Sequence, residues 1–193
     1  MKRSRVASYV APASRLAAAL IFGAVTFGAM TSIAWAQSTT ADSVQDLGTK
    51  IPDAASVKEG LFPEDACEEL RASGFKCMGV KPAMTFSLPA AAFALGSAVL
   101  PDMLKRQLDV FGEVLSSKKG SQQKVRIVGH ADASGSPEGN LALSQRRAEA
   151  VKAYLVTKGA EADMLQPAGV GSADLKNSDN PTAPENRRVT LGR

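Results

Sequence analysis

The stretch that decides the fold is "VRIVGHADASGSPEGNLALSQRRAEAVKAYLVTKGA", residues 125–160. It begins with β-branched residues, changes to small and polar turn-forming residues, and then becomes rich in helix formers. Residues 124–130 therefore predict a strand, and residues 141–158 predict a helix that ends at Gly159. One face of this helix is expected to be buried, and it carries Ser144, Ala148, Val151 and Leu155.

The segments on either side complete the pattern. Residues 84–89 alternate in polarity and predict a strand. Pro101 precedes a series of apolar residues at helical spacing, which predicts an amphipathic helix. Two further strands are expected within 164–171 and 187–192. The order β-α-β-α-β-β predicts an α+β sandwich in which the helices pack on one face of the sheet. The apolar series is Leu100, Leu104, Leu108, Phe111 and Leu115.

Residues 1–36 have the features of a signal peptide. A basic start is followed by an uncharged apolar run, and a small-x-small triplet predicts cleavage between Ala36 and Gln37. The run is close to 20 residues long, so the alternative is an uncleaved membrane anchor. No cysteine follows it, which argues against lipid attachment of the bacterial lipoprotein kind. Either arrangement exports the protein.

Two segments separate this leader from the main domain. Residues 37–60 are polar and lack a sustained apolar period, so they are expected to form a linker or an extended tether. Residues 61–82 are expected to form a small segment with a helix that starts at Pro63. In an oxidising compartment, Cys67 and Cys77 are expected to form a disulfide, and the alternative is two independent thiols.

Composition excludes several functions. The net charge of +4 comes from four basic residues in the first 36, and the remaining chain has 19 basic and 19 acidic residues. A nucleic-acid partner is therefore not expected. Two cysteines and a single histidine make a poor metal site, and no metal or cofactor is expected.

His130 is the one residue that suggests a hydrolase. His130 and Asp132 are two positions apart at a strand end, where alternation would put both on one face. A triad would also need a nucleophile, and although Ser134 and Ser136 are nearby, no nucleophile elbow is present. The sequence therefore favours a protein that is not an enzyme, with His130 bonded to neighbouring backbone.

Asp132 and Arg147 allow two interpretations. They are 15 positions apart, on a loop and on the helix that follows it, so the chain can bring them to one mouth. They could form an ion pair that fastens the loop. They could instead bind a zwitterion, because a carboxylate accepts an ammonium and a guanidinium grips a carboxylate with two donors. A helix N-terminus nearby also favours an anion.

The quoted stretch resembles the central motif of OmpA-like peptidoglycan-binding domains. "FALGSAVL" at 93–100 is similar to the opening of these domains, and "NPTAPENRRV" at 180–189 is similar to their end. The resemblance implies an OmpA-like domain over residues 83–193, with helices on one face of a mixed sheet. It also implies non-covalent binding of peptidoglycan through the meso-diaminopimelate of the stem peptides.

Four site residues follow from the resemblance. Asp132 is expected to bind the ammonium of diaminopimelate and Arg147 its carboxylate, while Asn140 and Ser134 assist. The adjacent Arg146 is expected to be a solvated helix residue. For the arginine pair at 187–188, alternation across an edge strand is favoured over a place at the site. Ala131 and Val170 depart from the family pattern, which has a threonine and an aromatic residue there.

These features predict an exported wall-binding protein in the periplasm, associated with the outer membrane. The alternative, if residues 1–36 are retained, is a wall anchor tethered to the inner membrane. A second alternative is an envelope interaction module in which residues 61–80 recruit an outer-membrane or other envelope protein.

Overall fold

One mixed sheet, with the strand order β1-β2-β5-β3-β4, organises the part of the chain that the structure describes. The structure is a computed structural model, and it describes residues 43–89, 93–94 and 96–193. The elements are β1 (Val44–Asp46), α1 (Ala54–Leu61), α2 (Pro63–Ala72), β2 (Thr85–Pro89), α3 (Asp102–Ser116), β3 (Val125–His130), α4 (Pro137–Thr157), β4 (Leu165–Gly169) and β5 (Arg188–Gly192).

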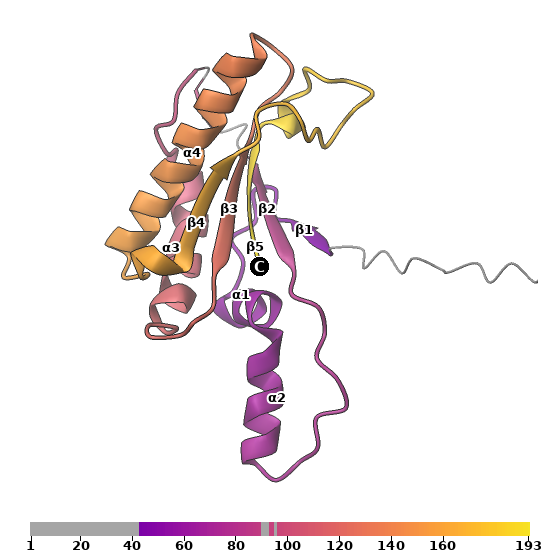
Figure 1. The fold of residues 1–193 in the computed structure, drawn as a ribbon, viewed down its shortest axis with the longest axis vertical. Coiled ribbons are helices and arrows are strands. Elements are labelled where there is room, and N and C mark those ends of the chain that lie inside the picture. The colour runs from indigo at the N-terminus through magenta and orange to yellow at the C-terminus, as the bar shows by residue number, and fades with distance from the viewer. Residues whose placement is uncertain (1–42, 90–92, 95) are drawn as a thin grey trace, which may run out of the picture. The chain divides into compact units, whose positions relative to one another are not determined.

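The pairing confirms the α+β prediction. β5 is antiparallel to both β2 and β3, whereas β1 pairs in parallel with β2 and β4 pairs in parallel with β3. Figure 1 shows α3 and α4 side by side against one face of the sheet. Because strand side chains alternate between the two faces of a sheet, every second residue of each strand points into the core beneath these helices. In β2, β3 and β5 the core residues are Phe86, Leu88, Val125, Ile127, Val189 and Leu191.

The two long helices bury the faces that their sequences predict. All four residues of the stripe expected on α4 are fully buried, and so are the central residues of the α3 series. α4 begins four residues before the predicted start. Ser136 caps it by accepting a hydrogen bond from the Gly139 amide at 3.1 Å, and Pro137 occupies its first turn.

The expectation of a linker over residues 37–60 needs correction for its described part, residues 43–60. This part contributes β1 at the sheet edge and α1 at the core. Leu47, Val57 and Leu61 are all buried in the main core. Val57 and Leu61 are at helical spacing, but two residues are too few to predict a helix, and Leu47 lies ten positions before Val57. Their burial in the main core therefore depends on long-range contacts.

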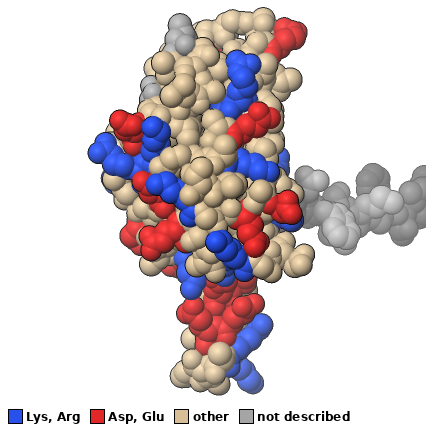
Figure 2. Space-filling view, turned by 90° about the vertical axis from the view of Figure 1, so that its left-hand side faces the viewer, with Lys and Arg blue, Asp and Glu red and all other residues tan. Residues whose placement is uncertain are grey.

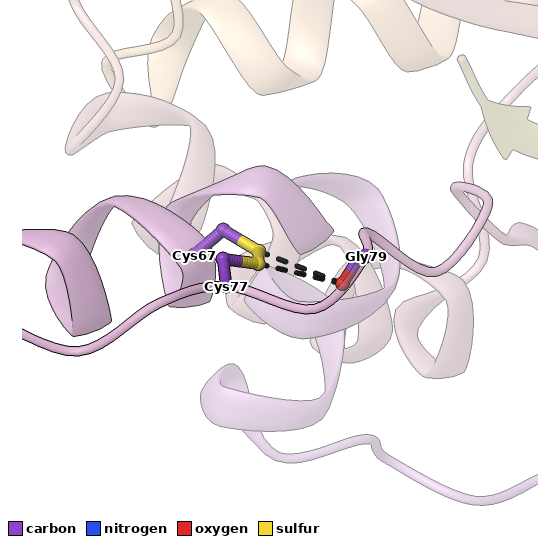
Figure 3. The surroundings of a disulfide bond; sticks show 3 residues. All are labelled: Cys67, Cys77 and Gly79. Atoms are coloured by element: carbon purple, nitrogen blue, oxygen red, sulfur yellow. Dashed lines mark hydrogen bonds between the residues drawn. A yellow bond between two sulfur atoms is a disulfide. The ribbon is translucent and has the colours of Figure 1, made fainter.

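α2 starts at Pro63 as predicted and projects away from the sheet (Figure 1). The predicted disulfide between Cys67 and Cys77 is present, with the Cα atoms 5.3 Å apart. The two sulfurs lie 3.6 and 3.4 Å from the Gly79 carbonyl oxygen (Figure 3). The disulfide therefore ties the helix to the extended segment that returns to β2.

The expected signal peptide, with its cleavage point between Ala36 and Gln37, lies outside the described residues. Within the described part of the chain, no helix has the length and apolar character needed to cross a membrane.

Candidate ligand-binding cleft

A cleft of about 500 Å³ opens where the loop after β3 meets the start of α4, and we call it the α4 cleft. All four predicted site residues line it. Its lining residues are Gly96, Ala131, Asp132, Ser134, Gly135, Ser136, Gly139, Asn140, Leu143, Arg146, Arg147 and Arg187. The structure therefore brings the candidate residues of the loop and the helix to one mouth.

Close packing of α4 on the sheet sets this geometry. A Cβ atom at Gly129 would overlap the backbone carbonyl of Ser144, and one at Gly169 would overlap the backbone of Gln145. Glycine at these two positions lets the helix approach β3 and β4 closely. The loop that joins β3 to α4 is thereby held against the first turns of the helix.

Asp132 is buried and fully engaged. Its Oδ1 accepts hydrogen bonds from the Ser134 amide, at 3.0 Å, and from the Ser134 hydroxyl. Its Oδ2 lies 2.6 Å from Nη1 of Arg187. Burial by itself would raise the pKa of Asp132, but the bonds from Ser134 and Arg187 outweigh it and hold the pKa below the usual value. Asp132 is therefore a carboxylate at neutral pH.

Arg147 is the largest fully buried side chain among the described residues, with 1% of its surface exposed. Its Nε donates to the Ser97 carbonyl at 3.0 Å, and its guanidinium lies 4.8 Å from the Phe93 ring centroid. Its Nη1 has no hydrogen-bond partner in the described structure. Burial, followed by the charge of Arg187, lowers the pKa of Arg147. A buried cation with an unused donor is a position that an anionic ligand would stabilise.

The structure differs from the first interpretation of Asp132 and Arg147, in which the two residues form an ion pair with each other. In the described part of the chain no ion pair joins these two residues, because Arg187 holds the Asp132 carboxylate. Arg147 is held instead by a backbone carbonyl and an aromatic ring. Among the described residues its positive charge therefore has no carboxylate partner.

The remaining predicted residues support the loop. Asn140 donates from Nδ2 to the backbone carbonyl of Asp132 at 3.0 Å, so it fixes the backbone that carries the carboxylate. The Ser134 hydroxyl is already committed to Asp132. Arg146 is exposed at the rim of the α4 cleft, as predicted.

Residues 92–189, half of the chain, match the family model described as the OmpA family. The chain belongs to the OmpA family. It is 42% identical over 82 residues to outer membrane protein A of Yersinia pseudotuberculosis, which covers 42% of this chain and 23% of that protein.

Two further relatives of this OmpA family member are both peptidoglycan-associated lipoproteins. The one from Pseudomonas aeruginosa is 38% identical over 101 residues, 51% of this chain and 58% of that protein. The crystal structure of the one from Burkholderia pseudomallei is 28% identical with a TM-score of 0.44, covering 50% of this chain and 81% of that one. The chain spans less than two thirds of the length of the Yersinia and Pseudomonas proteins.

Arg187 is the site residue that sequence reasoning missed. The favoured expectation, alternation of Arg187 and Arg188 across an edge strand, is wrong about the edge, because β5 lies inside the sheet between β2 and β3. The two side chains do lie on opposite sides of the sheet. Arg187 comes just before β5 and reaches the α4 cleft, whereas Arg188 lies on the other side of the sheet. The buried Asn186 places this turn by donating to the carbonyls of Asn177, Asn180 and Pro181.

Phe93 and Ser97 were also recognised in sequence only as part of an opening motif. The structure gives that motif a role, because the phenyl ring and the serine carbonyl of this segment together hold the Arg147 guanidinium. Their fixed spacing within the motif was the available signal.

His130 does not share a site with Asp132, so the expectation of a common face is wrong. β3 ends at His130, and the even-numbered residues of this strand face away from the helices, while the chain turns before Asp132. His130 Nδ1 lies 3.3 Å from the Asp174 carboxylate and from its carbonyl oxygen. Burial, then the charge of Arg188, lowers the pKa of His130 to about 4. It is a buried neutral residue at pH 7.

Among the described residues no group of three or more histidine, cysteine, aspartate or glutamate side chains is arranged to hold a metal ion.

Proposed function

We propose that this OmpA family member is a non-catalytic wall anchor, which binds peptidoglycan through the meso-diaminopimelate of its stem peptides. The α4 cleft supports this proposal because it contains both the buried carboxylate of Asp132 and the buried guanidinium of Arg147, which has an unused donor among the described residues. The name of the Pseudomonas aeruginosa relative, peptidoglycan-associated lipoprotein, supports the same ligand class.

The observation that carries the proposal is the state of Arg147. A buried unsatisfied donor on a charged group is costly, and a carboxylate that accepts two parallel hydrogen bonds would remove that cost. The free end of diaminopimelate presents a carboxylate and an ammonium on the same carbon. In the proposed complex the carboxylate contacts Arg147 and the ammonium contacts Asp132.

Arg187 has a defined part in this proposal. It neutralises Asp132 before the ligand arrives, which keeps a buried carboxylate paired. When the ligand ammonium contacts Asp132, Arg187 is released in part and becomes available to the peptide carbonyls or to a carboxylate. Three arginines against one aspartate leave the lining of the cleft positive, which suits a ligand with more acceptors than donors.

A binding role also fits the positions of the groups that a hydrolase would need. His130, which is the one histidine of the chain, lies on the sheet face opposite the helices, and the Ser134 hydroxyl is bonded to Asp132. The nucleophile and the base would thus be on different sides of the sheet.

We further propose that the protein is exported and works in the periplasm, in association with the outer membrane. The basic and apolar sequence of residues 1–36 supports export. N-terminal sequencing of the exported protein distinguishes a cleaved signal, which gives a chain that starts at Gln37, from an inner-membrane anchor that retains residue 1.

The function is tested by co-sedimentation with purified peptidoglycan sacculi, with and without excess free meso-diaminopimelate. We expect the protein to pellet with sacculi and to be released by the free ligand. Sacculi whose diaminopimelate amine has been acetylated should bind poorly, because the ammonium that faces Asp132 is lost. Protein that remains in the supernatant at low salt would overturn the proposal.

A further inference from the structure

The far end of α2 carries an unusual concentration of exposed apolar side chains. We call residues 70–81, which include the last turn of α2 and the segment after it, the α2 tip. Nine large hydrophobic residues are exposed in the described structure, and four of them lie in these twelve positions. They are Leu70, Phe75, Met78 and Val80, with exposed fractions of 45%, 65%, 98% and 50%.

The charges of the α2 tip have one sign. Its ionisable side chains are Arg71, Lys76 and Lys81, and the sequence contains no acidic residue between Glu69 and Asp102. Lys81 pairs with an exposed glutamate, whereas Arg71 and Lys76 form no ion pair within the described part of the chain. Figure 2 shows acidic side chains gathered on the upper part of the projecting segment and basic ones beside its end.

The α2 tip is held in a defined conformation. The amide of Phe75 donates to the Leu70 carbonyl at 2.9 Å and that of Gly74 donates to the Arg71 carbonyl at 3.0 Å, while Gly74 adopts a φ of +82°. This is the Schellman arrangement that ends a helix. The disulfide then closes the segment onto α2 (Figure 3). The apolar side chains are thus presented outward on a constrained turn.

We propose that the α2 tip docks on a phospholipid surface that contains anionic headgroups. Apolar side chains flanked by arginine and lysine match the chemistry of a membrane interface, where the apolar groups enter the acyl boundary and the cations contact phosphates. The tip lies at the end of a segment that projects from the rest of the described fold (Figure 1), so an extended surface can reach it without meeting the sheet.

The position of the tip makes this docking compatible with wall binding. Figure 1 shows that α4 begins at one end of the described structure, whereas α2 ends at the opposite end. The α4 cleft lies at the start of α4. A protein docked through the α2 tip would therefore leave the cleft free to face the peptidoglycan layer. The inference goes beyond the proposed function and does not depend on it.

The test uses a tryptophan placed at the tip. Trp35 is the sole tryptophan of the sequence, so the full chain with Trp35→Phe and Phe75→Trp has one tryptophan, which is excited selectively at the red edge of its absorption. Vesicles of phosphatidylethanolamine and phosphatidylglycerol with brominated acyl chains quench a tryptophan that enters the bilayer. We expect strong quenching at position 75. The matched control, Trp35→Phe with Val99→Trp, places the probe at a residue that is 77% exposed outside the tip, and it should remain unquenched.

Charge dependence provides the second arm. In the Phe75→Trp background, Arg71→Gln with Lys76→Gln should raise the lipid concentration needed for half-maximal quenching about thirtyfold. Each basic residue near an anionic surface contributes about fivefold in affinity. Lys50→Gln with Lys119→Gln, two exposed lysines outside the tip, should have little effect. Sacculus binding and thermal unfolding of all variants should match those of the parent chain, which separates failure of docking from failure of the wall site.

Two results would overturn the inference. One is equal, weak quenching at positions 75 and 99. The other is a tryptophan at position 75 that lipid leaves unchanged but that an envelope protein shields, which would assign the α2 tip to a protein partner.

Discussion

Arg187 and Asp132 are 55 residues apart in the sequence, and an Arg187 nitrogen lies 2.6 Å from the Asp132 carboxylate inside the α4 cleft. The carboxylate is thus neutralised by the residue just before β5, while Nη1 of Arg147 in α4 has no hydrogen-bond partner among the described residues. The α4 cleft thus holds a cation with an unused donor and an anion that is already paired. Ligand binding would exchange one ion pair for two.

Removal of the Arg147 side chain should weaken wall binding strongly. Arg147→Ala is expected to lower the affinity for sacculi at least about thirtyfold, because a charge-assisted pair of hydrogen bonds is lost. Arg147→Lys keeps the charge but not the planar fork and should bind with intermediate affinity. The matched control is Arg146→Ala, which removes the exposed neighbour. If Arg146→Ala and Arg147→Ala bound sacculi equally well, the proposed role of the Arg147 guanidinium in binding would be contradicted.

Asp132 should contribute to stability in a pH-dependent way. Its pKa is lower in the folded protein than the usual value of 3.8, so the folded state binds fewer protons than the unfolded chain does. Its stabilising contribution is therefore complete above pH 3.8 and is lost as the pH falls through the lower folded pKa. Urea unfolding of Asp132→Asn should show a deficit at pH 7 that shrinks below pH 3.8. Asp179→Asn, at an exposed position, should show no such trend.

His130 should produce an acid-sensitive step of its own. Its pKa falls from 6.5 in the unfolded chain to about 4 in the folded protein, so the unfolded state takes up the proton first. As the pH falls from 6.5 to 4, the free energy of unfolding should decrease by about 3 kcal/mol because of His130. Below pH 4 this residue should make no further difference. His130→Asn should lack this decrease. An identical pH profile for the variant between these limits would contradict the assignment.

Gly129 should not tolerate a side chain. Gly129→Ala would push a methyl group into the Ser144 carbonyl and separate α4 from β3, at a cost of at least about 2 kcal/mol in unfolding free energy. Gly139→Ala is the control, because its methyl group meets only the Ser136 hydroxyl, at 3.1 Å, and a shift of a few tenths of an ångström relieves this contact without loss of the Ser136 cap. Thermal unfolding should separate the two variants, and similar melting temperatures would mean that α4 moves freely on the sheet.

The disulfide should stabilise the α2 segment without serving the cleft. Cys67 and Cys77 are separated by ten positions, which corresponds to about 2.5 to 3 kcal/mol from loop-closure entropy. Cys67→Ser with Cys77→Ser should increase amide hydrogen exchange in residues 63–81 and leave sacculus binding unchanged. Loss of sacculus binding would show that this segment belongs to the wall site.

The local features of the fold could be predicted from the sequence. β3 and α4 are each specified by one continuous period of side chains, and Asp132 and Arg147 lie on a single strand-loop-helix unit. Chain connectivity alone restricts how far apart these two residues can be. The helix cap is local too, although Ser136 was recognised only once the helix start was known.

The tertiary structure decided the features that depend on which strands are neighbours. The position of β5 between β2 and β3 brings Arg187 to Asp132, and no short sequence pattern encodes that order. Leu47 and Val57 lie in the core although the apolar pattern around each is too short to predict burial. The sequence by itself determined the motif and its charged residues, because these follow from short-range periodicity. Which charge pairs with which was decided by strand pairing across the sheet, because an ion pair depends on distance in space.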